Sequence, residues 1–195
     1  MLTNKAAWMQ MWGPGGKAIA FNPLDPKPDM IHIETIAHTL ANQCRFAGSC
    51  HEFFSVAQHS VIVSSHCDEK DALWGLLHDA SEAYIVDIPR PLKNSKEFEA
   101  YYTFERMVMG VICEKWDLNP VMPESVRLAD EIGLAWEARD NLQPIIPEIW
   151  SDLPPLRNFS KLAPLAPRDA EQFFLNAYHR ILRKRELEEF RVPPR

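Results

Sequence analysis

The sequence has no run of about 18 apolar residues, the length that a helix needs to cross the hydrocarbon core of a bilayer. Its first residues, MLTNKAAWMQMWGPGGK, also lack the apolar stretch of a secretory signal. Internal repeats and low-complexity tracts are missing as well. We therefore expect a cytoplasmic protein with no contact to a membrane and no repeat architecture.

Cysteine pairs and an excess of positive charge are also absent. No CxxC pair occurs, so a cysteine zinc knuckle is not expected, and we expect four reduced thiols in the cytosol, at Cys44, Cys50, Cys67 and Cys113. The net charge of −6 argues against a nucleic acid polymer or an anionic membrane as partner. A small phosphate ester can still bind wherever positive charge is local.

What the sequence does contain predicts an all-α protein. Its 195 residues, 46 % hydrophobic and 25 % charged, suit one soluble domain with a substantial core. The Gly- and Pro-rich segment 1–30 predicts turns and a short hairpin formed by residues around 8–12 and 17–21. Residues 31–190 predict a helical bundle within the same domain, and residues 191–195 a loose tail.

Apolar residues at helical spacing predict six helices separated by turns. Ser55 is a suitable N-cap for the second predicted helix. The β-branched residues of that helix would also suit a strand. Pro123 is well placed in the first turn of the fifth. The predicted ranges are 32–44, 56–67, 71–86, 95–116, 123–142 and 167–190.

The third predicted helix carries charged groups where a core-facing stripe is expected. In LWGLLHDASEAYIVDIPRP, residues 73–91, apolar residues recur at three- and four-residue spacing, yet His78 and Asp79 lie at the centre and Glu82 follows one turn later. Charged groups are rarely buried unless they are paired or bind a metal. The segment therefore predicts either an ion pair within the core or a metal site.

A metal site would need further ligands from neighbouring helices, and His59 and Asp130 are candidates. Two histidines and two carboxylates suit Mn²⁺, Fe²⁺, Co²⁺ or Zn²⁺ and leave coordination positions open, as catalytic sites require. From the residues alone, His59 could instead pair with His66, seven positions later. Asp130 could also be an ordinary solvated acid.

The remaining histidines are expected to be surface or hydrogen-bonded residues. They are His32, His38, His51, His66 and His179.

Three segments together resemble the HD-domain metal-dependent phosphohydrolases. They are CRFAGSCHEFFSVAQHS, LLHDASEAYIVDIPRPLK and RLAD, and the order of H, HD and D matches that of the family. HDASEAY followed by DIPRPLK, with CRF upstream, is similar to the branch of bacterial 5′-deoxynucleotidases and related phage hydrolases. The resemblance covers approximately residues 33–141. It implies an HD-domain bundle in which His59, His78, Asp79 and Asp130 hold one divalent transition metal, and it leaves open a second divalent ion accompanying the substrate phosphates.

The resemblance also implies roles in substrate binding and catalysis. Glu82 matches the acid that assists attack of water on phosphorus, and Arg45 an arginine that contacts the phosphate or the sugar edge. Phe46 stands where the deoxynucleotidases have a Trp that disfavours a 2′-hydroxyl, so this departure weakens the inference of deoxy preference. Asp87 matches an acid that binds the 3′-hydroxyl, and Lys93, with Arg90 less directly, supplies charge for phosphate.

Four of these residues also have a structural alternative. Phe46 could belong to the core, Asp87 could brace the loop before Pro89, and Arg90 and Lys93 could be solvated loop charges.

The closer likeness is to the phage group, in HTLANQCRFAG, EFFSVAQHS and GPGGKAIAFNPLDP. It implies hydrolysis of dATP to deoxyadenosine and triphosphate, with dADP and dAMP as lesser substrates, and a role in clearing dATP where 2-aminoadenine replaces adenine in phage DNA. The alternatives are a 5′-deoxynucleotidase and a non-catalytic helical module with a structural metal. Cyclic nucleotide or alarmone hydrolysis fits the CRF and DIPRPLK segments less well. Relatives of this kind form dimers or larger rings, so a homo-oligomer is expected.

Overall fold

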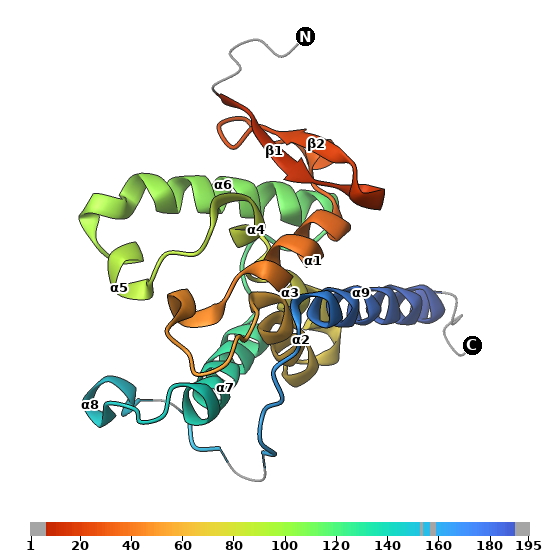
Figure 1. Ribbon diagram of the computed structural model, residues 1–195. Coiled ribbons are helices and arrows are strands. Elements are labelled where there is room, and N and C mark those ends of the chain that lie inside the picture. Colours follow the sequence, from red (N-terminus) through yellow and green to blue (C-terminus); the bar gives the residue numbers. More distant parts are fainter. Residues whose placement is uncertain (1–6, 153, 157–158, 190–195) are drawn as a thin grey trace.

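The computed structural model describes residues 7–152, 154–156 and 159–189, and these form a mostly helical fold with a small β-hairpin at one end (Figure 1). This confirms the predicted fold class. The predicted tail, residues 191–195, lies outside the described residues. None of the described helices is both long enough and apolar enough to cross a membrane.

The hairpin lies where the sequence predicted it. Strands β1 (Met9–Trp12) and β2 (Ala18–Phe21) pair antiparallel, with Met9 opposite Phe21. Gly15 and Gly16 in the turn have φ angles of 65° and 75°, which glycine adopts without steric cost. Phe21 is fully buried against Tyr84, so the hairpin is joined to the hydrophobic core.

The helices follow in chain order, and most of the long ones match the predicted ranges. They are α1 (Ile33–Asn42), α2 (Val56–His66), α3 (Ala72–Leu77), α4 (Glu82–Ile85), α5 (Arg90–Lys93), α6 (Glu99–Lys115), α7 (Glu124–Asn141), α8 (Pro147–Trp150) and α9 (Pro167–Glu189). The short helices α5 and α8 were not predicted, because each spans a single turn next to a proline. Pro123 is the N-cap of α7 and therefore lies just outside its first turn.

Helix α2 is the centre of the bundle, and α1, α3, α7 and α9 pack around it. Nine consecutive residues, 56–64, are buried, which is typical of a helix enclosed on all sides. Ser55 is its N-cap, because the Ser55 side chain accepts a hydrogen bond from the Gln58 backbone N–H. Ser60 donates its hydroxyl to the Val56 carbonyl of α2 itself, whereas the buried His59 ring meets partners from outside this helix.

The prediction of one continuous helix over 71–86 is wrong. Helix α3 ends at Leu77 and α4 begins at Glu82, with a tight turn between them. Nδ1 of His78 lies 2.8 Å from the Gly75 carbonyl, the group that the Asp79 N–H would reach in a continuous α-helix. The backbone instead forms the shorter bond from the Glu82 N–H to the Asp79 carbonyl. His78 and Asp79 consequently lie in a turn between two helices.

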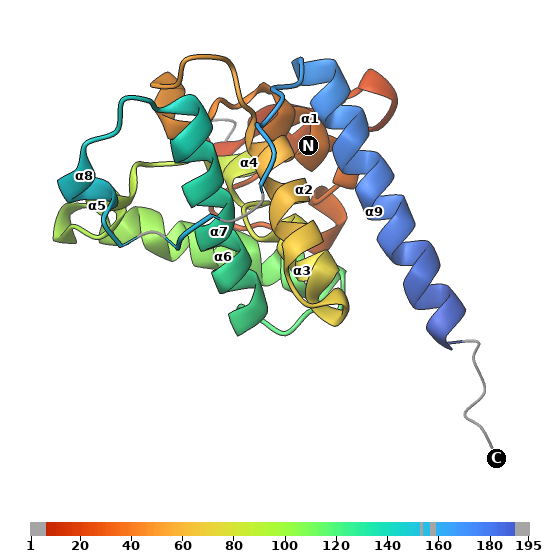
Figure 2. The ribbon, with the colours of Figure 1, turned by 90° about the horizontal axis from the view of Figure 1, so that it is seen from below.

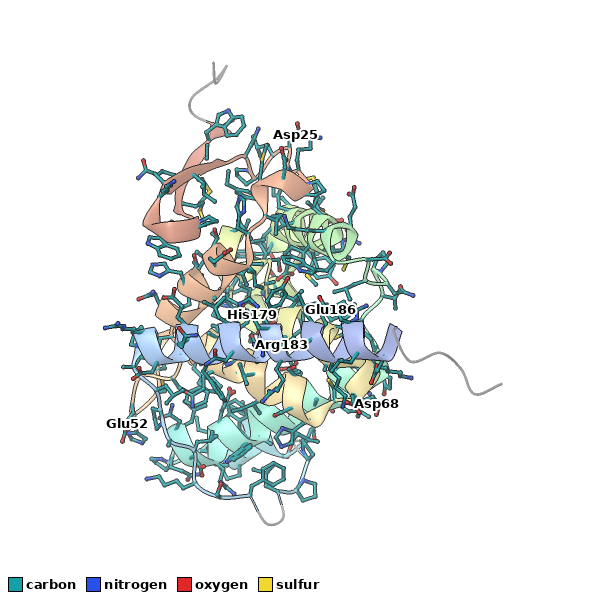
Figure 3. All side chains as sticks on the ribbon, turned by 90° about the vertical axis from the view of Figure 1, so that its right-hand side faces the viewer. Asp25, Glu52, Asp68, His179, Arg183 and Glu186 are labelled. Carbon is teal, nitrogen blue, oxygen red and sulfur yellow. The ribbon has the colours of Figure 1, made fainter. Side chains whose placement is uncertain are left out.

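Helix α9 crosses one face of the bundle, in contact with α1, α2 and α3, and its C-terminal part extends past the other helices (Figure 2). Its outer side carries exposed polar residues, including His179, Arg183 and Glu186 (Figure 3). The short helices α5 and α8 both lie on the side of the molecule away from α9 (Figures 1 and 2).

Candidate metal centre

His59 is a fully buried side chain on α2 whose two ring nitrogens face different partners. Nδ1 lies 2.6 Å from Oε1 of Glu137, so it donates a hydrogen bond to that carboxylate. Nε2 lies 3.2 Å from Nε2 of His78 and 3.1 Å from Oδ1 of Asp130. A histidine that binds a metal through one nitrogen commonly donates its other N–H to a carboxylate. His59 has this arrangement.

His78 is oriented in the same way from the turn after α3. Its Nδ1 donates to the Gly75 carbonyl, and its Nε2 faces His59 and lies 3.2 Å from Oδ2 of Asp79. At metal–nitrogen distances of about 2.0–2.1 Å, two nitrogens sharing one ion lie about 2.8–3.4 Å apart in octahedral or tetrahedral geometry. The observed separation of the two Nε2 atoms, 3.2 Å, falls in this range.

Two carboxylates complete the cluster. Oδ2 of Asp79 lies 3.7 Å from Nε2 of His59, and Oδ1 of Asp130 lies 3.9 Å from Nε2 of His78. The ligand atoms of His59, His78 and Asp79 all lie within 4.8 Å of one another, and these three residues form a group that could hold a metal ion. Asp130 comes from α7 and lies at the same place, which supports its predicted role as a fourth ligand.

The charges of this cluster favour a bound cation. Burial and Arg45 lower the pKa of His59, but Glu137 and Asp130 outweigh both and raise it to about 9. Burial raises the pKa of Asp130, but His59 and His78 lower it to about 2. The carboxylates of Glu137, Asp130 and Asp79 therefore surround the protonated His59 imidazole. A divalent ion can take the place of that proton, because imidazole and carboxylate are the ligands that Zn²⁺, Mn²⁺, Co²⁺ and Fe²⁺ accept.

Glu137 is a site residue that the sequence analysis missed. It is fully buried on α7, and its second oxygen, Oε2, lies 2.9 Å from Nε of Arg45. Burial raises the pKa of Glu137, but Arg45 and His59 outweigh burial and lower the pKa below its usual value. The sequence spacing could have indicated Glu137, because it follows Asp130 by seven residues, or two helical turns, and so lies on the same face of α7.

A second group of charges surrounds Lys93. Its Nζ lies 3.2 Å from Oε1 of Glu82, 2.9 Å from Oδ1 of Asp87 and 2.8 Å from Oε1 of Glu105. The structure thus brings together Glu82, Asp87 and Lys93 and excludes the alternative of a solvated Lys93. It also adds Glu105, which the sequence analysis did not single out.

Glu82 is buried at the start of α4, one turn after Asp79. Its Oε2 is buried and has no hydrogen-bond partner among the described residues. Burial is the main cause that raises the pKa of Glu82 well above its usual value, and Asp79 and Asp87 add to it. One ammonium at Lys93 thus faces the three carboxylates of Glu82, Asp87 and Glu105.

The backbone between Glu82 and Asp87 is strained. Val86 ends α4 with a φ of 64°, a left-handed conformation that is an outlier for a β-branched residue. The Tyr101 hydroxyl donates a hydrogen bond to the Val86 carbonyl. Such strain persists where surrounding contacts hold it, often at functional sites. Here it turns the chain so that Asp87 and Glu82 both face Lys93.

Arg45 and Phe46 lie at the edge of the candidate metal centre. Besides its contact with Glu137, Arg45 places NH1 3.8 Å from Oδ2 of Asp79. The Phe46 ring is half-buried and meets Trp150 of α8 edge-on, with centroids 6.2 Å apart. Phe46 is not part of the hydrophobic core, so the core alternative for this residue is wrong.

Arg90 is the most exposed of the predicted phosphate-binding groups. Its side chain is 69 % exposed, and NH2 lies 3.7 Å from Oδ2 of Asp130.

The alternative metal pair of His59 with His66 is wrong. His66 is exposed, and its Nδ1 lies 2.8 Å from the Ile62 carbonyl. Its ring stacks on that of Phe159, away from the cluster that contains His59 and His78. Nδ1 of His38 is hydrogen-bonded to Oε2 of Glu171 at 3.0 Å, as expected for a hydrogen-bonded histidine.

Comparison with known proteins gives relatives without a stated activity. The chain is 40 % identical to the uncharacterized protein YfdR of Escherichia coli over 157 residues, which cover 77 % of this chain and 84 % of YfdR. The chain belongs to the YfdR family. An uncharacterized protein of Rhodobacter capsulatus is 30 % identical to it over 147 residues, covering 69 % of this chain and 72 % of that protein. No family model matches the chain. Function in the YfdR family must therefore be argued from the site.

Proposed function

We propose that this protein is a metal-dependent deoxynucleotide phosphohydrolase that attacks the α-phosphorus, with dATP as its main substrate and deoxyadenosine and triphosphate as products. The observation that carries the proposal is the cluster of His59, His78, Asp79 and Asp130, flanked by the buried Glu82. A structural site has no need for a buried carboxylate with an unpartnered oxygen beside it. A hydrolytic site does, since a general base must reach water next to the metal. The resemblance to HD-domain phosphohydrolases supports the same reaction.

His59, His78, Asp79 and Asp130 would hold one divalent transition metal, which supplies Lewis-acid stabilisation of the phosphate charge and lowers the pKa of water. A second divalent ion accompanying the substrate phosphates remains part of the proposal. Glu82 would accept a proton from the attacking water through Oε2. Its raised pKa makes the Glu82 carboxylate a stronger base than an exposed glutamate.

Positive charge for the phosphates comes from three residues around the cluster. Carboxylates hold Arg45 and Lys93 in place, so their N–H donors would be preorganised for a phosphate. The exposed Arg90 side chain can turn from Asp130 toward an entering phosphate and bind it in a bidentate way. Asp87 would bind the 3′-hydroxyl, and the Phe46 ring would crowd the sugar.

The proposal is tested by supplying each metal and each nucleotide separately. Protein treated with a chelator and reloaded with Mn²⁺, Co²⁺, Fe²⁺ or Zn²⁺ is incubated with every dNTP, every dNMP and the ribose equivalents, and products are separated by chromatography. Deoxyadenosine with intact triphosphate from dATP supports the main proposal. Nucleoside and phosphate from several dNMPs, with dNTPs untouched, would identify a 5′-deoxynucleotidase instead. No turnover with any metal would favour a non-catalytic module.

Two variants locate the reaction at this site. Glu82→Gln should keep the metal and lose at least 100-fold in kcat, the typical contribution of a general base. Glu99→Gln is the matched control, because Glu99 lies exposed in the first turn of α6. The double variant His78→Ala, Asp79→Ala should lose both metal and turnover. Hydrolysis that survives this double change would show that the reaction takes place elsewhere.

A further inference from the structure

Cys44 and Cys50 lie side by side at the two ends of a tight turn. Their Sγ atoms are 3.3 Å apart, and both side chains are partly exposed. The Sγ of Cys50 also donates to the Arg45 carbonyl, at 3.7 Å. A disulfide needs an S–S distance of about 2.05 Å, so the sulfurs must approach by about 1.2 Å. Small side-chain and backbone movements provide this.

The backbone brings these thiols together. Phe46, Ala47 and Gly48 take successive left-handed conformations, with φ angles of 55°, 50° and 82°, which reverse the chain within three residues. The base of the turn is closed by the hydrogen bond from the Arg45 N–H to the Phe54 carbonyl, at 2.8 Å.

The Arg45 side chain anchors the same turn to Glu137. Cys44 and Cys50 therefore belong to a constrained loop, and the backbone of that loop holds the two thiols close together.

We propose that Cys44 and Cys50 form a reversible redox site that is oxidised by low-molecular-weight disulfides such as oxidised glutathione. One thiolate attacks the glutathione disulfide and forms a mixed disulfide, releasing one reduced glutathione. The second thiolate then displaces the bound glutathione. The protein loses two protons and two electrons, the Cys44–Cys50 bond forms, and two glutathione molecules leave reduced.

This bond would act on the edge of the metal centre. Closing it removes the S–H donor from the Arg45 carbonyl and shifts the backbone next to Arg45, whose side chain contacts Glu137 and lies near Asp79. Cys67 and Cys113 provide internal controls, since Cys113 is buried and Cys67 donates a hydrogen bond to the Ser64 carbonyl of its own helix.

The test uses the full-length protein in buffers of oxidised and reduced glutathione. Free thiols, counted by alkylation in denaturant and intact mass, should fall from four to two. Trypsin cleaves after Arg45, between the two cysteines, so the oxidised protein should yield peptide 18–45 linked to peptide 46–70. The second peptide also contains Cys67, so the experiment is repeated with Cys67→Ser, which should keep the link.

Cys44→Ser and Cys50→Ser should each abolish the link, and circular dichroism checks that both variants remain folded. Glutathione adducts alone, or four free thiols at every ratio of oxidised to reduced glutathione, would overturn the proposal.

A functional consequence rests on the proposed function. Oxidised wild-type protein should hydrolyse dATP at least threefold more slowly, dithiothreitol should restore the rate, and Cys44→Ser should not respond to the oxidant. A link that forms without any change in rate would overturn the consequence and leave the redox site standing. The disulfide-linked peptides are detected by mass, so the redox site is tested whether or not the protein hydrolyses nucleotides.

Discussion

Single residues at the candidate site are held by partners on other helices, and Glu137 is the clearest case. It joins Arg45 of the loop before α2 to His59 of α2, and all three side chains are largely buried. Removing one member of a buried charged network leaves the others uncompensated, which is more costly than losing a surface pair.

Glu137→Gln should therefore lower metal affinity about 10- to 100-fold, as expected for a partner that orients a metal ligand. It should also reduce the free energy of unfolding by roughly 3 kcal/mol. Calorimetric metal titration and chemical denaturation measure the two effects. The control is Glu124→Gln on the same helix, whose exposed pair with Arg127 contributes little. Equal metal affinity in the two variants would contradict the role given to Glu137.

Metal binding should depend on pH through His59. In the metal-free protein its pKa is about 9, so at pH 7 the ring is protonated and Nε2 must lose its proton before it can ligate. Apparent affinity should rise about tenfold per pH unit between pH 6 and 8 and level off near pH 9. Asp130, with a pKa of about 2, is already ionised throughout this window.

Calorimetry in buffers of different ionisation enthalpy should show about one proton released per metal at pH 7. Affinity that stays constant from pH 6 to 9 would exclude His59 as a ligand.

At the level of elements, the close approach of α7 to α2 fixes the position of the His59 ring. A Cβ atom at Gly133 of α7 would lie 3.3 Å from Cε1 and 3.4 Å from Nδ1 of His59. The ring cannot easily move, because Glu137 holds its Nδ1 at 2.6 Å. Glycine at this position thus lets the two helices approach at the group of side chains that could hold a metal.

Gly133→Ala should accordingly lower metal affinity several-fold and fail to stabilise the protein, despite the higher helix propensity of alanine. Gly110→Ala on α6 is the matched control, because its added Cβ meets no atom within 4 Å. That variant should gain about 0.5–1 kcal/mol in free energy of unfolding and leave metal binding unchanged. If Gly133→Ala gained as much stability as Gly110→Ala and kept its metal affinity, the close contact between Gly133 and His59 would not be needed for metal binding.

For the whole molecule, the cluster connects α2, the turn between α3 and α4, and α7. A ligand that binds only the folded state stabilises it by a free energy that rises with the logarithm of the ligand concentration once this exceeds the dissociation constant. Chelated protein supplied with Zn²⁺ or Mn²⁺ at 100 times the dissociation constant should gain about 2.7 kcal/mol in free energy of unfolding. Thermal unfolding with increasing metal measures this gain. The double variant His78→Ala, Asp79→Ala should show none, and an equal gain in that variant would place the metal elsewhere.

Local sequence information determined most of the helices and the hairpin, and it singled out His59, His78 and Asp79, which could hold a metal ion. Hydrophobic periodicity marks which residues face a core, and buried acids beside histidines require compensation wherever they lie. The break at His78 depended instead on a side chain competing for the Gly75 carbonyl. The Glu137–His59 contact and the meeting of Phe46 with Trp150 join residues about 80 to 100 positions apart. Such pairings are decided by how helices pack against one another, because no local pattern records which distant face a side chain will meet.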